Sequence, residues 1–112
     1  MYDERIEKDM DAVQDMMSYL NLYSMKLYEV GCIVKEVQPK NGEKISLEEA
    51  QALVGGYVEL VHLDDNNILL CDEEGLLKHK PINTLATIQA KGLGWKGSYL
   101  VGSVLFLKDK EF

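Results

Sequence analysis

Residues 45–72 read ISLEEAQALVGGYVELVHLDDNNILLCD, and a helix followed by two strands can be read directly from this segment. Ser46 can cap the helix N-terminus, and Glu49, three residues later, can complete a capping box by returning a hydrogen bond. The glycine pair that follows ends the helix, as glycine commonly does at a helix C-terminus. Two strand-like runs, at 57–62 and 68–72, flank the turn-forming residues LDDNN. The segment therefore predicts a helix followed by a β-hairpin.

A second hairpin precedes this segment. Residues 25–30 (MKLYEV) and 33–37 (IVKEV) alternate between apolar and polar side chains, and Gly31 lies between the two runs. Alternation with a period of two is typical of strands that bury one face, and glycine accommodates the turn between them. Two more strands are therefore expected before the first helix of the domain.

The remaining segment begins with a turn and ends with an apolar run. Residues 73–75 (EEG) predict a turn, and Asn83 can cap a short helix over residues 84 to about 90. Residues 99–107 (YLVGSVLFL) are apolar enough to form a central strand. Together these segments predict an α+β fold, with a mainly antiparallel sheet of four to five strands and two short helices.

The first 24 residues differ in character from the rest of the chain. They carry six acids against two bases, and their apolar residues recur at steps of three and four, as on one face of a helix: Ile6, Met10, Val13, Met17 and Leu20. We therefore expect two parts, an acidic amphipathic N-terminal helix in residues 1–24 and an α+β domain in residues 25–112. The apolar stripe can pack on the protein's own sheet, or form a seam with a partner or a second copy in a homo-oligomer. The sequence leaves both arrangements open.

The overall charge disfavours nucleic acid as a ligand. The chain has 19 acidic and 12 basic residues, a net charge of −7, and Arg5 is its only arginine. Arginine makes the bidentate contacts that phosphates and base edges favour, so direct nucleic-acid binding is not expected. No run of about 20 apolar residues predicts a membrane span, and the acidic N-terminus does not resemble a signal peptide. We therefore expect a cytoplasmic protein that does not contact membranes.

Motifs for catalysis or cofactor binding are absent from the sequence. Cys32 and Cys71 lie far apart without a C-x-x-C pattern, so we expect two reduced and mostly buried thiols and no zinc site. His62 and His79 have no neighbouring metal-ligand pattern, and no serine lies in a G-x-S-x-G elbow. The sequence therefore predicts neither an enzyme nor a bound cofactor or metal.

Residues 91–97 (KGLGWKG) contain a literal G-x-G-x-x-G pattern, which binds phosphate in dinucleotide-binding folds. That function needs glycines that follow a strand and open a helix, whereas here a predicted helix precedes the glycines and a strand follows them. A narrower interpretation concerns Trp95, which can stack on a base while Lys91 and Lys96 face a phosphate. Trp95 can instead fold back on the core as an apolar lid.

Five motifs resemble those of a family whose function is not known. They are KEVQPKNG at 35–42, ISLEEAQALVGGYVE at 45–59, DEEG at 72–75, NTLAT at 83–87 and YLVGSVLF at 99–106. The resemblance covers residues 25–107 approximately and departs at Asp72, where the family tends to have Asn. It implies a short accessory protein of bacteriophages and mobile elements of gut bacteria, acting in the bacterial cytoplasm. It implies no activity. The motif positions that it suggests as candidate site residues are Gly55, Gly56, Tyr57, Glu59, Glu73, Glu74, Gly75 and Asn83.

The leading functional hypothesis is a non-catalytic counter-defence inhibitor. Such a protein would act by stoichiometric binding to a host defence protein, using its acidic surface to occupy a basic one. The predicted N-terminal helix would make the contact. Its partner-binding residues would be Asp3, Glu4, Glu7, Asp11, Asp15, Met10 and Met17.

An alternative hypothesis from another class is a sponge for a nucleotide immune signal. A cyclic oligonucleotide or a cyclic ADP-ribose derivative would be bound and sequestered without chemical change. In this hypothesis Trp95 stacks on the base, lysines face the phosphate and Asn83 reads a base edge. The full set of ligand residues would be Trp95, Lys91, Lys96, Lys78, Asn83, Tyr57 and Glu59.

Overall fold

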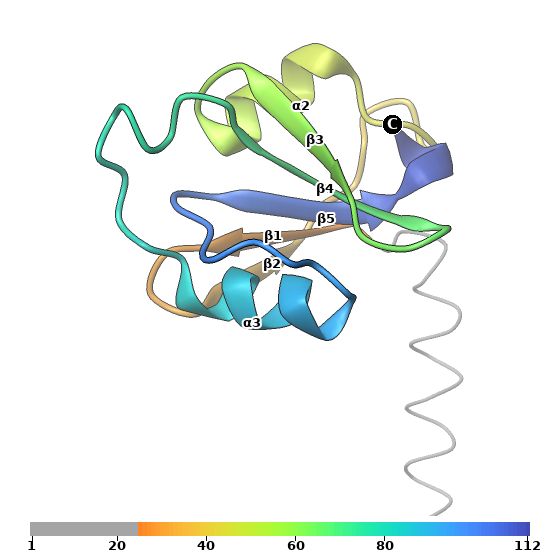
Figure 1. Ribbon diagram of the computed structural model, residues 1–112. Coiled ribbons are helices and arrows are strands. Elements are labelled where there is room, and N and C mark those ends of the chain that lie inside the picture. The colour runs from red at the N-terminus through yellow and green to blue at the C-terminus, as the bar shows by residue number, and fades with distance from the viewer. Residues whose placement is uncertain (1–24) are drawn as a thin grey trace, which may run out of the picture.

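Five short strands form one antiparallel sheet in the order β2-β1-β5-β4-β3 (Figure 1). The structure is a computed structural model that describes residues 25–112. Its elements in chain order are β1 (Lys26–Glu29), β2 (Ile33–Glu36), α2 (Leu47–Val54), β3 (Val58–His62), β4 (Asn67–Asp72), α3 (Thr84–Gly92), β5 (Val104–Lys108) and a short 3₁₀ turn, η2 (Asp109–Glu111). The predicted α+β fold and its antiparallel sheet are confirmed. The helix predicted in residues 1–24 lies outside the described residues.

The two helices cover opposite faces of the sheet (Figure 1). Alternate residues of β4 and β5 point to opposite faces, so each strand contributes to two cores. The core under α2 contains Ala50, Val54, Ile68, Leu70, Leu105 and Leu107. The core under α3 contains Leu69, Cys71, Ala86, Ala90, Val104 and Phe106. Burial on both faces explains why β4 and β5 are unbroken apolar runs although all their neighbours are antiparallel.

Local hydrogen bonds define both ends of α2. The Ser46 hydroxyl accepts a hydrogen bond from the Glu49 N–H at 3.1 Å, and the Glu49 carboxylate accepts one from the Ser46 N–H. At the other end Gly55 has a φ of +80°, a conformation that glycine adopts without strain. The capping box and the glycine stop predicted from the sequence are therefore confirmed.

The capping box provides a first test of the structure. Replacing Ser46 with alanine removes the acceptor for the Glu49 N–H, and we expect the free energy of unfolding to fall by about 1 kcal/mol. Urea denaturation measures this change. Ser98→Ala is the matched control, because Ser98 is exposed and lies outside the helices, and its effect should be below about 0.5 kcal/mol. Equal effects of the two substitutions would contradict a stabilising cap at Ser46.

The last strand is shorter than the sequence predicts. The prediction of a strand over residues 99–107 is wrong in its first half, because β5 begins at Val104 and only an isolated bridge joins Val101 to Ile82. Gly102 has a φ of +68°, and its N–H donates to the Pro81 carbonyl instead of to a neighbouring strand. Residues 99–103 are therefore bound to the segment around the start of α3. The central position predicted for this strand is confirmed.

Candidate partner-binding loop

The connection between β4 and α3 is organised around a buried carboxylate. Asp72 ends β4, and its side chain is 1% exposed. One carboxylate oxygen accepts from both the Lys78 and the Lys80 ammonium groups at 2.7 Å, and the other accepts from the Glu74 N–H at 2.9 Å. The chain must turn back on itself to place these three donors around one carboxylate. We refer to residues 73–80 as the Asp72 loop.

The charge on Asp72 is stabilised by its partners. Burial raises the pKa of the Asp72 carboxyl, but hydrogen bonds from Lys78, Lys80 and the Glu74 N–H outweigh this effect and hold the pKa at about 2. The hydrogen bond to Asp72 in turn raises the pKa of Lys78, although burial opposes it. The Asp72 carboxylate and the Lys78 ammonium group are therefore both charged near neutral pH.

The same lysines attach the Asp72 loop to the end of α2. Lys80 Nζ donates to the Val54 carbonyl at 2.9 Å, and Lys78 Nζ donates to the Gly55 carbonyl at 3.3 Å. These are carbonyls at the C-terminal end of the helix, where cations are favourable. A Cβ on Gly56 would lie 2.6 Å from Lys78 Nζ and 2.7 Å from the Asp72 oxygens, so glycine is needed for this close approach.

Backbone hydrogen bonds hold the Asp72 loop in a compact turn. Within it, the N–H of Lys78 donates to the Glu74 carbonyl at 2.9 Å and the N–H of Lys80 to the Gly75 carbonyl at 3.1 Å. The predicted turn at residues 73–75 is present, and residues 76–80 after it form no strand. The reason is that the lysines after the turn bind Asp72 instead of continuing the sheet.

The apex of the Asp72 loop presents two leucines to solvent. Leu76 is 63% exposed and Leu77 is 80% exposed, although the loop that carries them is held by ion pairs to the buried Asp72 carboxylate. Glu73 and Glu74, separated from the leucines by Gly75, are also exposed. Tyr57, whose carbonyl accepts from the Glu73 N–H at 2.8 Å, is 68% exposed. The loop therefore combines apolar side chains at its apex with acidic side chains at its base.

Asn83, a predicted cap and a predicted ligand residue, is 1% exposed. Its Oδ1 accepts from the Ala86 N–H at 3.0 Å, which confirms the cap of α3. Its Nδ2 donates at 2.8 Å to the Tyr28 carbonyl and at 2.8 Å to the Gly102 carbonyl. These bonds use both amide hydrogens and tie α3 to β1 and to the segment before β5. Asn83 is therefore not available to read the edge of a bound base.

The other residues predicted to bind a nucleotide fall into two groups. Lys91 is in the last turn of α3, and Trp95 and Lys96 follow it, whereas Tyr57 precedes β3 and Lys78 contacts Asp72. Gly94, the residue before Trp95, lies beside the carbonyl of Leu63, the residue after β3, so the groups lie at opposite ends of that five-residue strand. They do not form one site.

Trp95 is half-buried against the core under α3, as the lid interpretation expects. A Cβ on Gly97 would overlap the Trp95 ring, and Gly94 has a φ of +97°. α3 precedes these glycines and no helix follows them before β5. This is the reverse of the strand–glycine–helix order in dinucleotide-binding folds, as the sequence predicted. Gly97 therefore makes room for the indole ring, and Gly94 adopts a backbone conformation that favours glycine.

The cysteines do not form an activated site. Cys71 is buried, and burial followed by the nearby Glu59 carboxylate raises the pKa of its thiol to about 12. Its Sγ lies 3.8 Å from Glu59 Oε2, which gives Glu59 a contact within the sheet. Cys32 is free but exposed in the β1–β2 turn, so the expectation that it is buried is wrong. Within residues 25–112, no group of three or more metal-ligating side chains of His, Cys, Asp or Glu is assembled.

Comparison with protein families gives one match. Residues 28–112 match the model of a domain of unknown function, DUF3846. The chain belongs to the DUF3846 family. No curated protein and no solved structure matches it. Of the helices in the described part of this DUF3846 chain, none is long and apolar enough to cross a membrane.

Four of the eight motif positions singled out in the sequence, Gly55, Gly56, Gly75 and Asn83, have a structural role. Gly55 ends α2, and Gly56 leaves space for Asp72 and Lys78. A Cβ on Gly75 would lie 2.9 Å from Val101 Cγ2, so this glycine allows the Asp72 loop to pack against the segment before β5. The exposed motif residues are Tyr57, Glu59, Glu73 and Glu74. Sequence reasoning missed the exposed Leu76 and Leu77, whose only signal was two adjacent leucines after a turn.

Proposed function

We propose that this protein is a non-catalytic binding protein that occupies a basic surface of a partner protein through the Asp72 loop. The observation that carries the proposal is the exposure of Leu76 and Leu77 on a loop whose shape is held by a buried carboxylate and two lysines. Apolar side chains held in place on a rigid support lose little conformational entropy when a partner buries them. A rigid apolar apex of this kind favours recognition of a protein surface.

Acidic side chains around the apex favour a partner with positive charge. Glu73 and Glu74 lie in the same loop as the leucines, and the whole chain carries a net charge of −7. We infer that the partner has an apolar depression rimmed by lysine or arginine. Charge complementarity of this kind mainly accelerates association and selects among partners.

The acidic N-terminal residues extend this proposal. Residues 1–24 contribute −4 of the net charge, and residues 25–112 have thirteen acids against ten bases. We propose that the acids of the first segment provide a second contact to the same partner, through Asp3, Glu4, Glu7, Asp11 and Asp15, with Met10 and Met17 on the apolar stripe. Methionine is suited to such a contact because its flexible side chain adapts to irregular surfaces.

The biological setting that we propose is counter-defence. The resemblance noted in the sequence implies a phage or mobile-element accessory protein, and a small binding protein without chemistry of its own can act on a host defence protein by occupying it. Asp72, Lys78 and Lys80 bind one another and the end of α2. Their charges therefore hold the Asp72 loop in shape, which supports a binding role.

Substitution of the two exposed leucines tests the Asp72 loop. The full-length protein, immobilised and incubated with bacterial host lysate, retains proteins that mass spectrometry identifies, and their affinities are then measured with purified components. We expect Leu76→Ser combined with Leu77→Ser to weaken binding of the true partner by roughly tenfold or more, because two apolar contacts are lost. Raising the salt concentration should weaken binding further, because exposed charges are screened.

Leu47→Ser combined with Ile88→Ser is the matched control. Leu47 and Ile88 are 52% and 62% exposed and lie on α2 and α3, away from the Asp72 loop. The control should retain wild-type affinity. A partner that binds the loop variant as tightly as the wild type, or equal losses in both variants, would refute the proposed contact. A separate variant, in which the charges of the five N-terminal acids are reversed, measures the second contact.

A further inference from the structure

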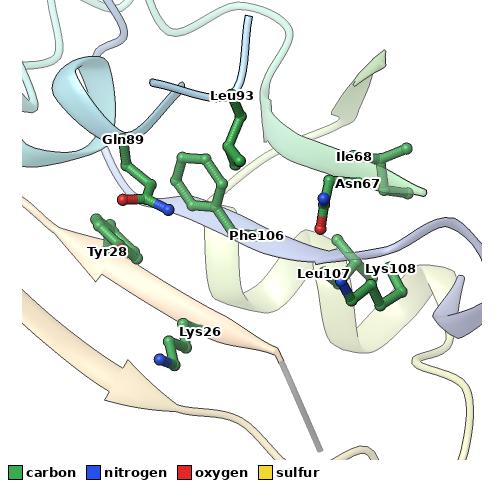
Figure 2. A pocket seen from close by; sticks show the side chains of 9 residues that line it. All are labelled: Lys26, Tyr28, Asn67, Ile68, Gln89, Leu93, Phe106, Leu107 and Lys108. Atoms are coloured by element: carbon green, nitrogen blue, oxygen red, sulfur yellow. The ribbon is translucent and has the colours of Figure 1, made fainter. Parts of the chain in front are cut away.

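A hollow lies on the α3 side of the sheet, at the end opposite the Asp72 loop. Its volume is about 390 Å³, and it is lined from β1, β4, β5 and α3 (Figure 2). Asn67 and Ile68, at the start of β4, border it, whereas the Asp72 loop begins where β4 ends. The hollow and the loop are therefore separated by the length of a central strand. A volume of this size lies within the range of small-molecule sites.

Aromatic rings form the apolar part of the hollow. Tyr28 and Phe106 project from neighbouring strands with ring centroids 4.7 Å apart and planes tilted by 53°. Leu93 adds an aliphatic side chain and Gln89 an amide, both from the α3 side (Figure 2). An aromatic surface bordered by an amide suits a planar ring with polar edges.

Two lysines form the cationic part of the hollow. Lys26 lies opposite Phe106 in the β1–β5 register, and Lys108 lies opposite Asn67 in the β4–β5 register. Within residues 25–112, neither ammonium group is within ion-pair distance of a carboxylate. The adjacent Asp64 accepts from Asn67 Nδ2 at 2.9 Å and 3.1 Å, so its carboxylate is already hydrogen-bonded. Glu36 lies opposite Lys26 in the β1–β2 register, and hydrogen bonds, chiefly from Asn67, together with the charge of Lys108 lower the pKa of Asp64, but neither ammonium group is held in an ion pair within residues 25–112.

We propose that this hollow binds a planar aromatic ring that carries a phosphate group, as in a nucleoside monophosphate. The ring packs on Tyr28 and Phe106, the phosphate contacts Lys26 and Lys108, and the Gln89 amide contacts the edge of the ring. Lysine binds phosphate as a point charge, so the absence of arginine from the hollow is compatible with this ligand. None of these residues was assigned to a ligand from the sequence.

The test is a titration of the ¹⁵N-labelled full-length protein, followed by amide chemical shifts. The probes are adenosine 5′-monophosphate, adenosine and ribose 5-phosphate. The first carries both the aromatic ring and the phosphate, the second carries the ring alone, and the third carries the phosphate alone. We expect adenosine 5′-monophosphate to shift the amides of Lys26, Phe106, Lys108 and Gln89 in a saturable way, and each fragment to bind at least about tenfold more weakly. Equal affinity for ribose 5-phosphate would overturn the proposal, because it would indicate anion binding without ring recognition.

Two charge-matched variants locate the site. Lys26→Gln combined with Lys108→Gln should lower the affinity for adenosine 5′-monophosphate by about tenfold, and Lys91→Gln combined with Lys96→Gln should leave it unchanged. Loss of affinity in the second variant would place the ligand beside Trp95 and overturn the proposal. Absence of saturation below about 5 mM would overturn it as well. The outcome is independent of the Asp72 loop experiment, because neither pair of lysines belongs to that loop.

Discussion

Replacing Asn83 with alanine is expected to lower the free energy of unfolding by about 3 to 5 kcal/mol. The substitution removes an acceptor from the Ala86 N–H and a donor from each of the Tyr28 and Gly102 carbonyls, at a site that is 1% exposed. Each buried polar group that loses its only partner costs about 1 to 3 kcal/mol, and the vacated volume adds a cavity term. The loss is a large part of the 5 to 15 kcal/mol that stabilises a typical domain.

Urea denaturation of the full-length protein measures this loss, and Asn66→Ala is the control. Asn66 is exposed in the turn between β3 and β4, so its substitution should change stability by less than about 0.5 kcal/mol. Asn83→Asp separates the two functions of the amide, because it keeps the acceptor for Ala86 but places a carboxylate against two carbonyl oxygens. It should be destabilised as well. A change below about 1 kcal/mol for Asn83→Ala would show that the three bonds do not stabilise the fold as described.

The sequence predicted α2 and the cap of α3 because their determining contacts are local. Ser46 and Glu49 are three residues apart, and Asn83 caps an N–H three residues ahead. The other two bonds of Asn83 connect it to partners 55 and 19 residues away. No periodicity or spacing encodes such pairs, so the sequence identified Asn83 as a cap but not as a buried link between α3 and two other segments.

The candidate loop could not be predicted for the same reason. In the sequence Asp72 ends a predicted strand and begins the DEEG motif, and the lysines that bind it are six and eight residues further on, a spacing without a general structural meaning. The sequence predicted a turn at residues 73–75 but gave no sign that Leu76 and Leu77, which follow it, are exposed. The hollow was missed because Lys26, Gln89 and Lys108 are far apart in the chain and meet only through the strand order.

Replacing Asp72 with alanine is expected to lower the free energy of unfolding by about 2 kcal/mol and to release the Asp72 loop. The change removes one acceptor from two ammonium groups and another from the Glu74 N–H. Lys78 and Lys80 are 40% and 22% exposed, so they can turn toward water, and the cost is smaller than for a fully buried pair. Hydrogen exchange should show faster exchange at the Glu74 and Lys80 amides. Unchanged exchange would mean that backbone hydrogen bonds alone maintain the loop.

The pH dependence of stability separates the charge of Asp72 from its size. The pKa of Asp72 is about 2 in the folded protein and about 3.9 in an unfolded chain, so its carboxylate stabilises the fold above about pH 5 and loses this effect as the pH falls toward 2. Asp72→Asn keeps an acceptor for the Glu74 N–H but has no charge. Its stability should lie about 1 kcal/mol below that of the wild type at pH 7, and the two curves should converge in acid. A gap that stays constant from pH 7 to pH 2 would contradict an ionic role for Asp72. If the gap closes and the Asn variant also binds the partner more weakly, the ion pairs hold Leu76 and Leu77 in the binding conformation.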